Sequence, residues 1–146
     1  MSAKWTLDVN NMQDDFFSDT ALIGIACSML HHKFCWTLNN YFDIDLVREP
    51  ELDIQIKSAS GNEVFFPIYQ YHFPVGGGRY LIYKLKNGDD FLLQEVKQLD
   101  YLWLVQGNNA DASALDIIQK LRNLSDVQLA QLIAPERLKN LNHLLI

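Results

Sequence analysis

The fold is decided by residues 99–105, which read Leu99-Asp100-Tyr101-Leu102-Trp103-Leu104-Val105. Successive side chains of a strand point to opposite faces of its sheet, and here both faces are apolar apart from Asp100. A strand of this kind is typical of the middle of a sheet that is covered on both sides. A carboxylate there is costly unless it is paired or hydrogen-bonded. We therefore predict a covered sheet with this strand inside it.

The residues before this strand predict an antiparallel meander. Four successive stretches have strand character: Leu52–Lys57, Glu63–Phe73, Arg79–Lys86 and Phe91–Val105. Short turns separate them, and Asn87-Gly88 is the strongest hairpin signal because both residues tolerate a positive φ. Pro67 cannot donate a ladder hydrogen bond, so its strand is predicted to be an edge or to carry a bulge.

The rest of the chain predicts two main helices and three further strands. Helical spacing begins at His31 with Phe34, Leu38 and Tyr41 on one stripe, and a second helix, capped by Asp111 or Ser113, carries Leu115, Ile118, Leu121 and Leu124. The further strands are Lys4–Val9, Leu22–Cys27 and Val127–Ile133, and Pro135 starts a short last helix. The sequence predicts one α+β domain over residues 1–146. Its mostly antiparallel sheet has about six or seven strands with the meander at its centre, and the two helices pack on it.

Composition limits the classes of partner. The chain has 146 residues, of which 49% are hydrophobic, so we expect a single ordered domain. The net charge of −6 argues against nucleic acid and against anionic membrane surfaces. The first residues lack the pattern of a signal peptide, and the apolar stretch 21–30 is shorter than the roughly 20 residues that span a bilayer. We expect a cytoplasmic protein that binds neither nucleic acid nor membranes.

Motifs for metal, cofactor or catalytic chemistry are weak. Suitable ligand types for zinc are present at Cys27, His31, His32 and Cys35, but they are not spaced as the two close ligand pairs of a zinc knuckle. Buried thiols also often act as small hydrophobic side chains. The glycines at 76–78 precede a predicted strand rather than the helix that a phosphate loop requires. There is no Gly-x-Ser-x-Gly elbow for acyl transfer. We therefore predict no metal, no cofactor and no catalytic residue, and we favour a binding protein over an enzyme.

Four residues are candidates for a binding site. Glu95 and Asp100 interrupt the apolar run, and as an acid–base pair they would need a suitable separation and perturbed pKa values. In the structural alternative, Glu95 lies at a kink between two strand pieces, and Asp100 pairs with a lysine, an arginine or backbone N–H groups. As a binding site, Glu95, Asp100 and Tyr101 would line one pocket. Trp36 is the fourth candidate because it lies off the main helical stripe, where a partly exposed ring would be available to a ligand. The alternative for Trp36, as for Trp103, is a place in the core.

Three short motifs resemble those of a known family. Residues 95–101, Glu95-Val96-Lys97-Gln98-Leu99-Asp100-Tyr101, are similar to the signature of the IPExxVDY family of uncharacterised bacterial proteins. The residues at 95, 100 and 101 match, whereas 93, 94 and 99 differ and one extra residue lies between positions 95 and 99. The stretches 22–25 (Leu-Ile-Gly-Ile) and 35–39 (Cys-Trp-Thr-Leu-Asn) are similar to two further family motifs in the same order. The resemblance implies a bacterial cytoplasmic protein with a common fold and supplies no catalytic residue.

Two functional hypotheses remain. The first is a non-catalytic protein-interaction or regulatory module that forms a homodimer, since the chain is rich in aromatic residues and the strand with Pro67 would offer an edge for pairing. The second is a small-molecule-binding protein or enzyme with a pocket near Glu95, Asp100 and Tyr101. The surroundings of Asp100 distinguish them. An open apolar cavity favours the second, and a lysine or arginine contact in a filled core favours the first.

Overall fold

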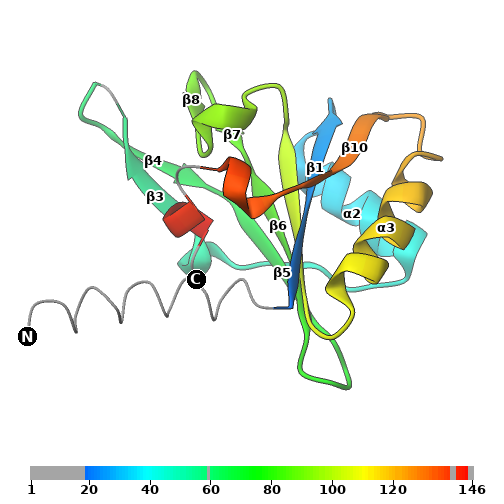
Figure 1. The fold of residues 1–146 in the computed structure, drawn as a ribbon. Coiled ribbons are helices and arrows are strands. Elements are labelled where there is room, and N and C mark those ends of the chain that lie inside the picture. The colour runs from blue at the N-terminus through cyan, green and yellow to red at the C-terminus, as the bar shows by residue number, and fades with distance from the viewer. Residues whose placement is uncertain (1–18, 59, 139–140, 145–146) are drawn as a thin grey trace, which may run out of the picture.

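The computed structural model describes residues 19–58, 60–138 and 141–144. They form an α+β fold whose six-stranded antiparallel sheet has the order β10-β1-β9-β6-β5-β2 (Figure 1). Its strands are β1 (Thr20–Cys27), β2 (Val47–Arg48), β5 (Ile68–His72), β6 (Arg79–Lys84), β9 (Tyr101–Gln106) and β10 (Val127–Ile133). The helices α2 (His31–Phe42) and α3 (Ala110–Leu121) lie on one face of the sheet. The strand predicted over Lys4–Val9 lies outside the described residues.

The strand β9 occupies the middle of the sheet, as the sequence predicts, but it is shorter than the strand predicted over Phe91–Val105. It begins at Tyr101, and residues 92–100 form turns and a short 3-10 helix. Its residues 101–105 are each at most 2% exposed, and β1 and β6 pair with it on either side. Tyr101 and Trp103 point into the core beneath the helices, whereas Leu102 and Leu104 point into a second core on the opposite face. The indole of Trp103 makes edge-on contacts with the rings of Phe42 and Tyr80, with centroids 5.2 and 5.1 Å apart. Both faces of the sheet are therefore covered.

Short elements cover the face opposite the helices. Two small hairpins, β3 (Ile54–Lys57) with β4 (Glu63–Phe66) and β7 (Lys86–Asn87) with β8 (Asp90–Phe91), lie there beside four short 3-10 helices. The 3-10 helices are η1 (Pro50–Leu52), η2 (Gln94–Val96), η3 (Pro135–Arg137) and η4 (Leu141–Leu144). Buried side chains from these elements and from the turns beside them, including Phe66, Val96 and Leu144, complete the second core.

The predicted meander is interrupted at Pro67. The strand predicted over Glu63–Phe73 is split there, because the proline has no N–H to donate. Its first part, β4, pairs only with β3 in a separate two-stranded sheet, and its second part, β5, joins the main sheet between β6 and β2. The first hairpin of the meander therefore lies outside the main sheet. The predicted edge is found in part: β4 pairs on one side only, whereas β5 lies between two strands of the main sheet, whose long edge strand is β10.

Both main helices form where they were expected, with differences in detail. In α2, Phe34, Cys35 and Leu38 are buried, but Tyr41 is 42% exposed because its hydroxyl reaches across to donate to the carbonyl of Lys120 in α3. The predicted caps of α3 are wrong, since the helix begins after Asn109, which has a φ of 58°. Leu115 of α3 is 52% exposed instead of buried. In the described ranges, neither helix is long and apolar enough to cross a membrane.

Candidate functional site

Asp100 has a structural environment at the start of β9. Its Oδ2 accepts a hydrogen bond from the backbone N–H of Cys27 at 2.8 Å. Its Oδ1 lies 3.1 Å from Nζ of Lys86, which forms an ion pair with it. These are the two kinds of partner that the structural alternative requires. The carboxylate therefore connects the end of β1 to β7, next to a packed core.

Replacing Asp100 by alanine is expected to lower the free energy of unfolding by about 1–3 kcal/mol, because the N–H of Cys27 loses its acceptor. Asp100→Asn keeps a carbonyl oxygen for that N–H and loses only the partly exposed ion pair, so its cost is expected to be below about 1 kcal/mol. Urea denaturation of the two variants measures the difference. Equal losses would contradict the assignment of the main role to the backbone hydrogen bond.

Tyr101 also has a structural environment. Its hydroxyl donates to the carbonyl of Met29 at 2.5 Å, and its ring stacks on Phe34 with centroids 4.3 Å apart. Burial raises the pKa of the Tyr101 phenol well above its ordinary value. The side chain is thus a neutral hydrogen-bond donor that holds the loop before α2 against the sheet.

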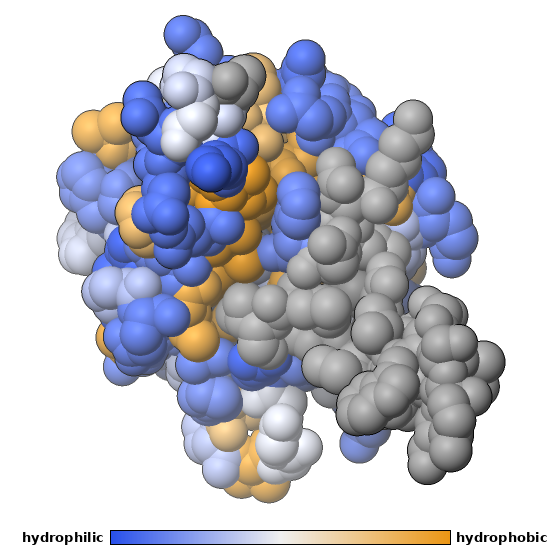
Figure 2. Space-filling model, turned by 90° about the vertical axis from the view of Figure 1, so that its left-hand side faces the viewer, coloured by the Kyte–Doolittle hydropathy of each residue, from blue (hydrophilic) through white to orange (hydrophobic). Residues whose placement is uncertain are grey.

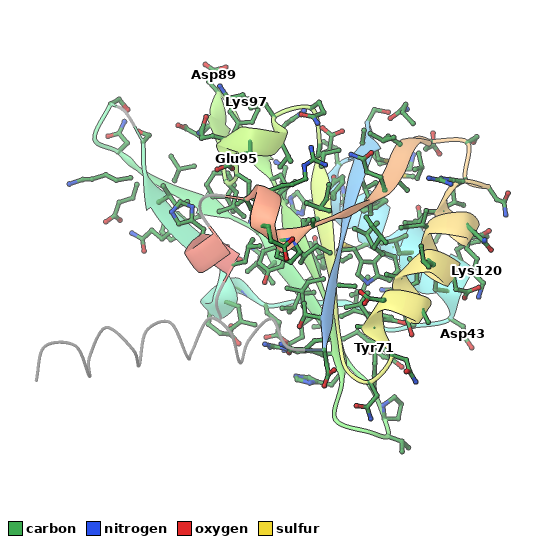
Figure 3. The ribbon with its side chains drawn as sticks, viewed as in Figure 1. Asp43, Tyr71, Asp89, Glu95, Lys97 and Lys120 are labelled. Carbon is green, nitrogen blue, oxygen red and sulfur yellow. The ribbon has the colours of Figure 1, made fainter. Side chains whose placement is uncertain are left out.

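The four predicted site residues lie on three elements or loops of the described part of the chain. Asp100 and Tyr101 are neighbours at the start of β9, and Glu95 is half-buried on η2, in the loop between β8 and β9 (Figure 3). Trp36 lies on α2 with 65% of its surface exposed, so it is not a core residue. Three hollows formed by described residues are lined by other side chains. The structure thus brings Asp100 and Tyr101 together, and each of them has its own structural partner.

The cysteine and histidine cluster is arranged for packing. Cys27 and Cys35 are buried thiols, and burial raises the pKa of both. Nδ1 of His31 lies 2.8 Å from the hydroxyl of Tyr69, whereas His32 is exposed. Within the described ranges, no three histidine, cysteine, aspartate or glutamate side chains are grouped so that they could hold a metal ion.

Stability is expected to rise with pH through the titration of His31. Burial, assisted by the positive charge of Lys84, lowers the pKa of His31 below its ordinary value of about 6.5. The pKa of His31 is thus lower in the folded chain than in the unfolded chain, and between these two values the unfolded chain binds more protons. The free energy of unfolding therefore increases with pH in this range, and the contribution of His31 is lost as the pH falls below about 6.5. Urea denaturation at several pH values, compared with His31→Gln, measures this slope. An unchanged slope in the variant would exclude His31 as the cause.

A hollow of about 270 Å³ lies between the two small hairpins. Its floor is apolar, with Ile56, Val64, Phe66 and Phe91, and its rim carries Lys57, Asp89, Asp90 and Lys97. Nζ of Lys97 lies 5.4 Å from the ring centroid of Phe91. Figure 2 shows apolar residues reaching the surface in the middle of this face, and Figure 3 shows Asp89 and Lys97 near its upper end. Gln94 and Lys97, which line the hollow, are close to Glu95 in the sequence. Neither Asp100 nor Tyr101 lines it.

The second candidate is the edge of the main sheet at β10, beyond which no described strand pairs, and sequence reasoning missed it. Leu129 and Leu132 of β10 are 37% and 40% exposed, and Leu115 of α3 is 52% exposed. Nη2 of Arg122, just after α3, donates to the carbonyl of Ala130 at 3.1 Å, and Asp111 at the start of α3 lines a hollow of about 310 Å³ together with Leu132. We call this region the β10–α3 surface. It consists of Leu129–Leu132 with Asp111, Leu115, Ile118 and Arg122.

Two residues of β10 direct their backbone groups away from β1 along this surface. The carbonyl of Ile25 accepts from the N–H of Asp100 in the segment leading into β9, so Ile25 directs its backbone groups away from β10. Ala130 lies opposite Ile25, and Leu132 lies opposite Ile23, which has the same orientation. Opposed residues of an antiparallel pair either bond to each other or both point away. The N–H and C=O groups of Ala130 and Leu132 therefore point outward. Leu132 is exposed there, whereas Ala130 is 0% exposed and its carbonyl accepts from Arg122.

Comparisons with known proteins add no assignment to these sites. No family model, no curated protein and no solved structure matches the chain. The similarity of residues 95–101 to the IPExxVDY signature stays a prediction, and the two candidate sites rest on their geometry alone.

Proposed function

We propose that the chain is a non-catalytic protein-interaction module that binds a polypeptide through the β10–α3 surface. It acts in the bacterial cytoplasm, as the resemblance to the IPExxVDY family implies. The observation that carries the proposal is the combination of an open sheet edge with three exposed leucines, at positions 115, 129 and 132. Leu115 and Leu132 flank the edge on the helix side, and Leu129 flanks it on the opposite side.

The edge strand lacks the usual protection against pairing. Natural proteins protect such edges with charged residues, prolines or very short strands. The strand β10 has seven residues, Val-Gln-Leu-Ala-Gln-Leu-Ile, with neither a charge nor a proline. Ala130 is covered, since it is 0% exposed and its carbonyl accepts a hydrogen bond from Arg122, so Leu132 is the exposed residue with outward-pointing backbone groups. An added strand would receive main-chain hydrogen bonds from this edge, and the leucines would give it apolar contacts.

Site-specific photo-crosslinking in growing cells tests the proposal. We expect a photoreactive phenylalanine analogue in place of Leu132 to become joined to a polypeptide. The same analogue at Val75, which is 87% exposed in a loop, serves as the matched control and is expected to give only background. Equal yields at the two positions would contradict the proposal.

A second candidate function is the binding of a small molecule in the hollow between the hairpins. Two lysines and two aspartates lie around an apolar floor in this hollow. Such a lining suits a zwitterion with an apolar side chain, such as leucine or phenylalanine. Calorimetric titration with these amino acids is expected to give heat that disappears in a Lys57→Glu, Lys97→Glu double variant. The absence of heat with the unaltered chain would exclude this candidate.

A further inference from the structure

We infer that the polypeptide bound by the β10–α3 surface is a second copy of this chain, joined so that two β10 strands pair antiparallel about a two-fold axis at Gln131. This inference rests on the proposed function and names its partner. It extends the six-stranded sheet of one copy into the sheet of the other.

Pairing about Gln131 matches the outward-facing backbone groups. The axis places Ala130 of one copy opposite Leu132 of the other, and the N–H and C=O groups of both residues point to the edge. Ala130 is 0% exposed in a single copy, so pairing requires Arg122 to move away from it. Each such pair forms two ladder hydrogen bonds. The same axis puts Leu132 beside the small side chain of Ala130 on the helix face, and Leu129 beside Ile133 on the opposite face. The exposed leucines therefore gain apolar neighbours.

The flank of α3 supplies charge complementarity for a second copy. Asp111, Leu115, Ile118 and Arg122 follow one another at helical spacing and lie on the side of α3 toward β10. The order along this stripe is acid, apolar, apolar, base. A two-fold axis perpendicular to the sheet makes the two copies of α3 antiparallel, so the acid of each stripe faces the base of the other. A stripe with this order is complementary to itself.

Arg122 sets the cost of pairing. Its hydrogen bond to the carbonyl of Ala130 occupies one acceptor that the second β10 strand requires. Pairing displaces this side chain, and the freed guanidinium is then directed toward Asp111 of the other copy. The chain thus exchanges one hydrogen bond within a copy for an ion pair between copies, and the remaining ladder hydrogen bonds and apolar contacts favour the dimer.

Sedimentation equilibrium of the purified chain and a cysteine cross-link test the inference together. Residues at the axis form a non-hydrogen-bonded pair with Cα atoms about 4.5 Å apart, which is within the range of disulfides. We expect a dimer in solution, and we expect Gln131→Cys to form a disulfide-linked dimer under mild oxidation. Glu63→Cys, exposed on the small hairpin, is the matched control and is expected to stay monomeric on denaturing gels. The native Cys27 and Cys35 are each 1% exposed and do not compete.

The outcomes separate the inference from the proposed function. A monomer at submillimolar concentration overturns the inference, and so does a dimer in which the two cysteine variants cross-link at the same rate. If the pure chain is monomeric but the photoreactive residue at Leu132 captures another polypeptide, the interaction module stands with a different partner. If that residue captures nothing, both fail. Circular dichroism of the two variants confirms that each is folded.

Discussion

Replacing Trp103 by alanine is expected to lower the free energy of unfolding by about 3–5 kcal/mol, the largest effect of any single change considered. The indole is fully buried on the middle strand of the sheet and contacts Phe42 from α2 and Tyr80 from β6. Its removal leaves a cavity where a helix, the central strand and a neighbouring strand meet. Urea denaturation followed by far-ultraviolet circular dichroism measures the loss.

Trp36 provides the matched control for this prediction. It is 65% exposed on α2, so Trp36→Ala is expected to change the free energy of unfolding by no more than about 0.5 kcal/mol. The two variants thus compare the same substitution, tryptophan to alanine, at a core position and at a surface position. Similar losses in both variants would show that the sheet is not covered as described.

Charge reversal at the two ends of α3 is expected to have the second largest effect. Asp111→Arg or Arg122→Asp alone would place like charges opposite each other in the dimer, and each is expected to weaken self-association by at least about tenfold, or 1.4 kcal/mol. The double variant restores opposite charges in reversed order and is expected to recover most of the affinity. Sedimentation equilibrium of the four proteins at low salt gives the dissociation constants.

The double variant also controls for folding. Arginine near the start of α3 opposes the helix dipole, so Asp111→Arg is expected to cost about 0.3–1 kcal/mol of stability in each copy. The double variant keeps that cost. Recovery of dimerisation therefore cannot come from improved folding. Additive losses in the double variant would contradict the antiparallel arrangement of the two α3 helices.

The sequence predicted the layers of the fold but not the connections between strands. Residues 101–105 are apolar on both faces, and this local pattern alone places β9 inside a covered sheet. The order of the strands depends on long-range pairing. No local pattern indicates that β1 lies between β9 and β10, and this arrangement decides which edge stays open. The predicted edge at Pro67 is therefore found only in the small sheet, where β4 pairs with β3 alone, and not in the main sheet.

The candidate sites were predictable to different degrees. The need of Asp100 for a partner follows from its apolar neighbours, but its partner Cys27 lies 73 residues away and is set by the fold. Leu115 has the same helical spacing as buried Ile118, so periodicity assigned both to the core. Leu115 is exposed on α3, which lies near the edge of the sheet, where no described strand pairs beyond β10. The β10–α3 surface thus required the strand order before it could be found.

Amide hydrogen exchange of β10, resolved by nuclear magnetic resonance, tests pairing at this edge most directly. Leu129 and Gln131 lie opposite Ala26 and Gly24, and their N–H groups point toward β1 in a single copy. They are expected to be protected at every protein concentration. The N–H group of Leu132, which points outward on an exposed residue, is expected to exchange rapidly in dilute protein and to become protected as the dimer forms. Rapid exchange of Leu132 at concentrations where the chain is dimeric would contradict strand pairing.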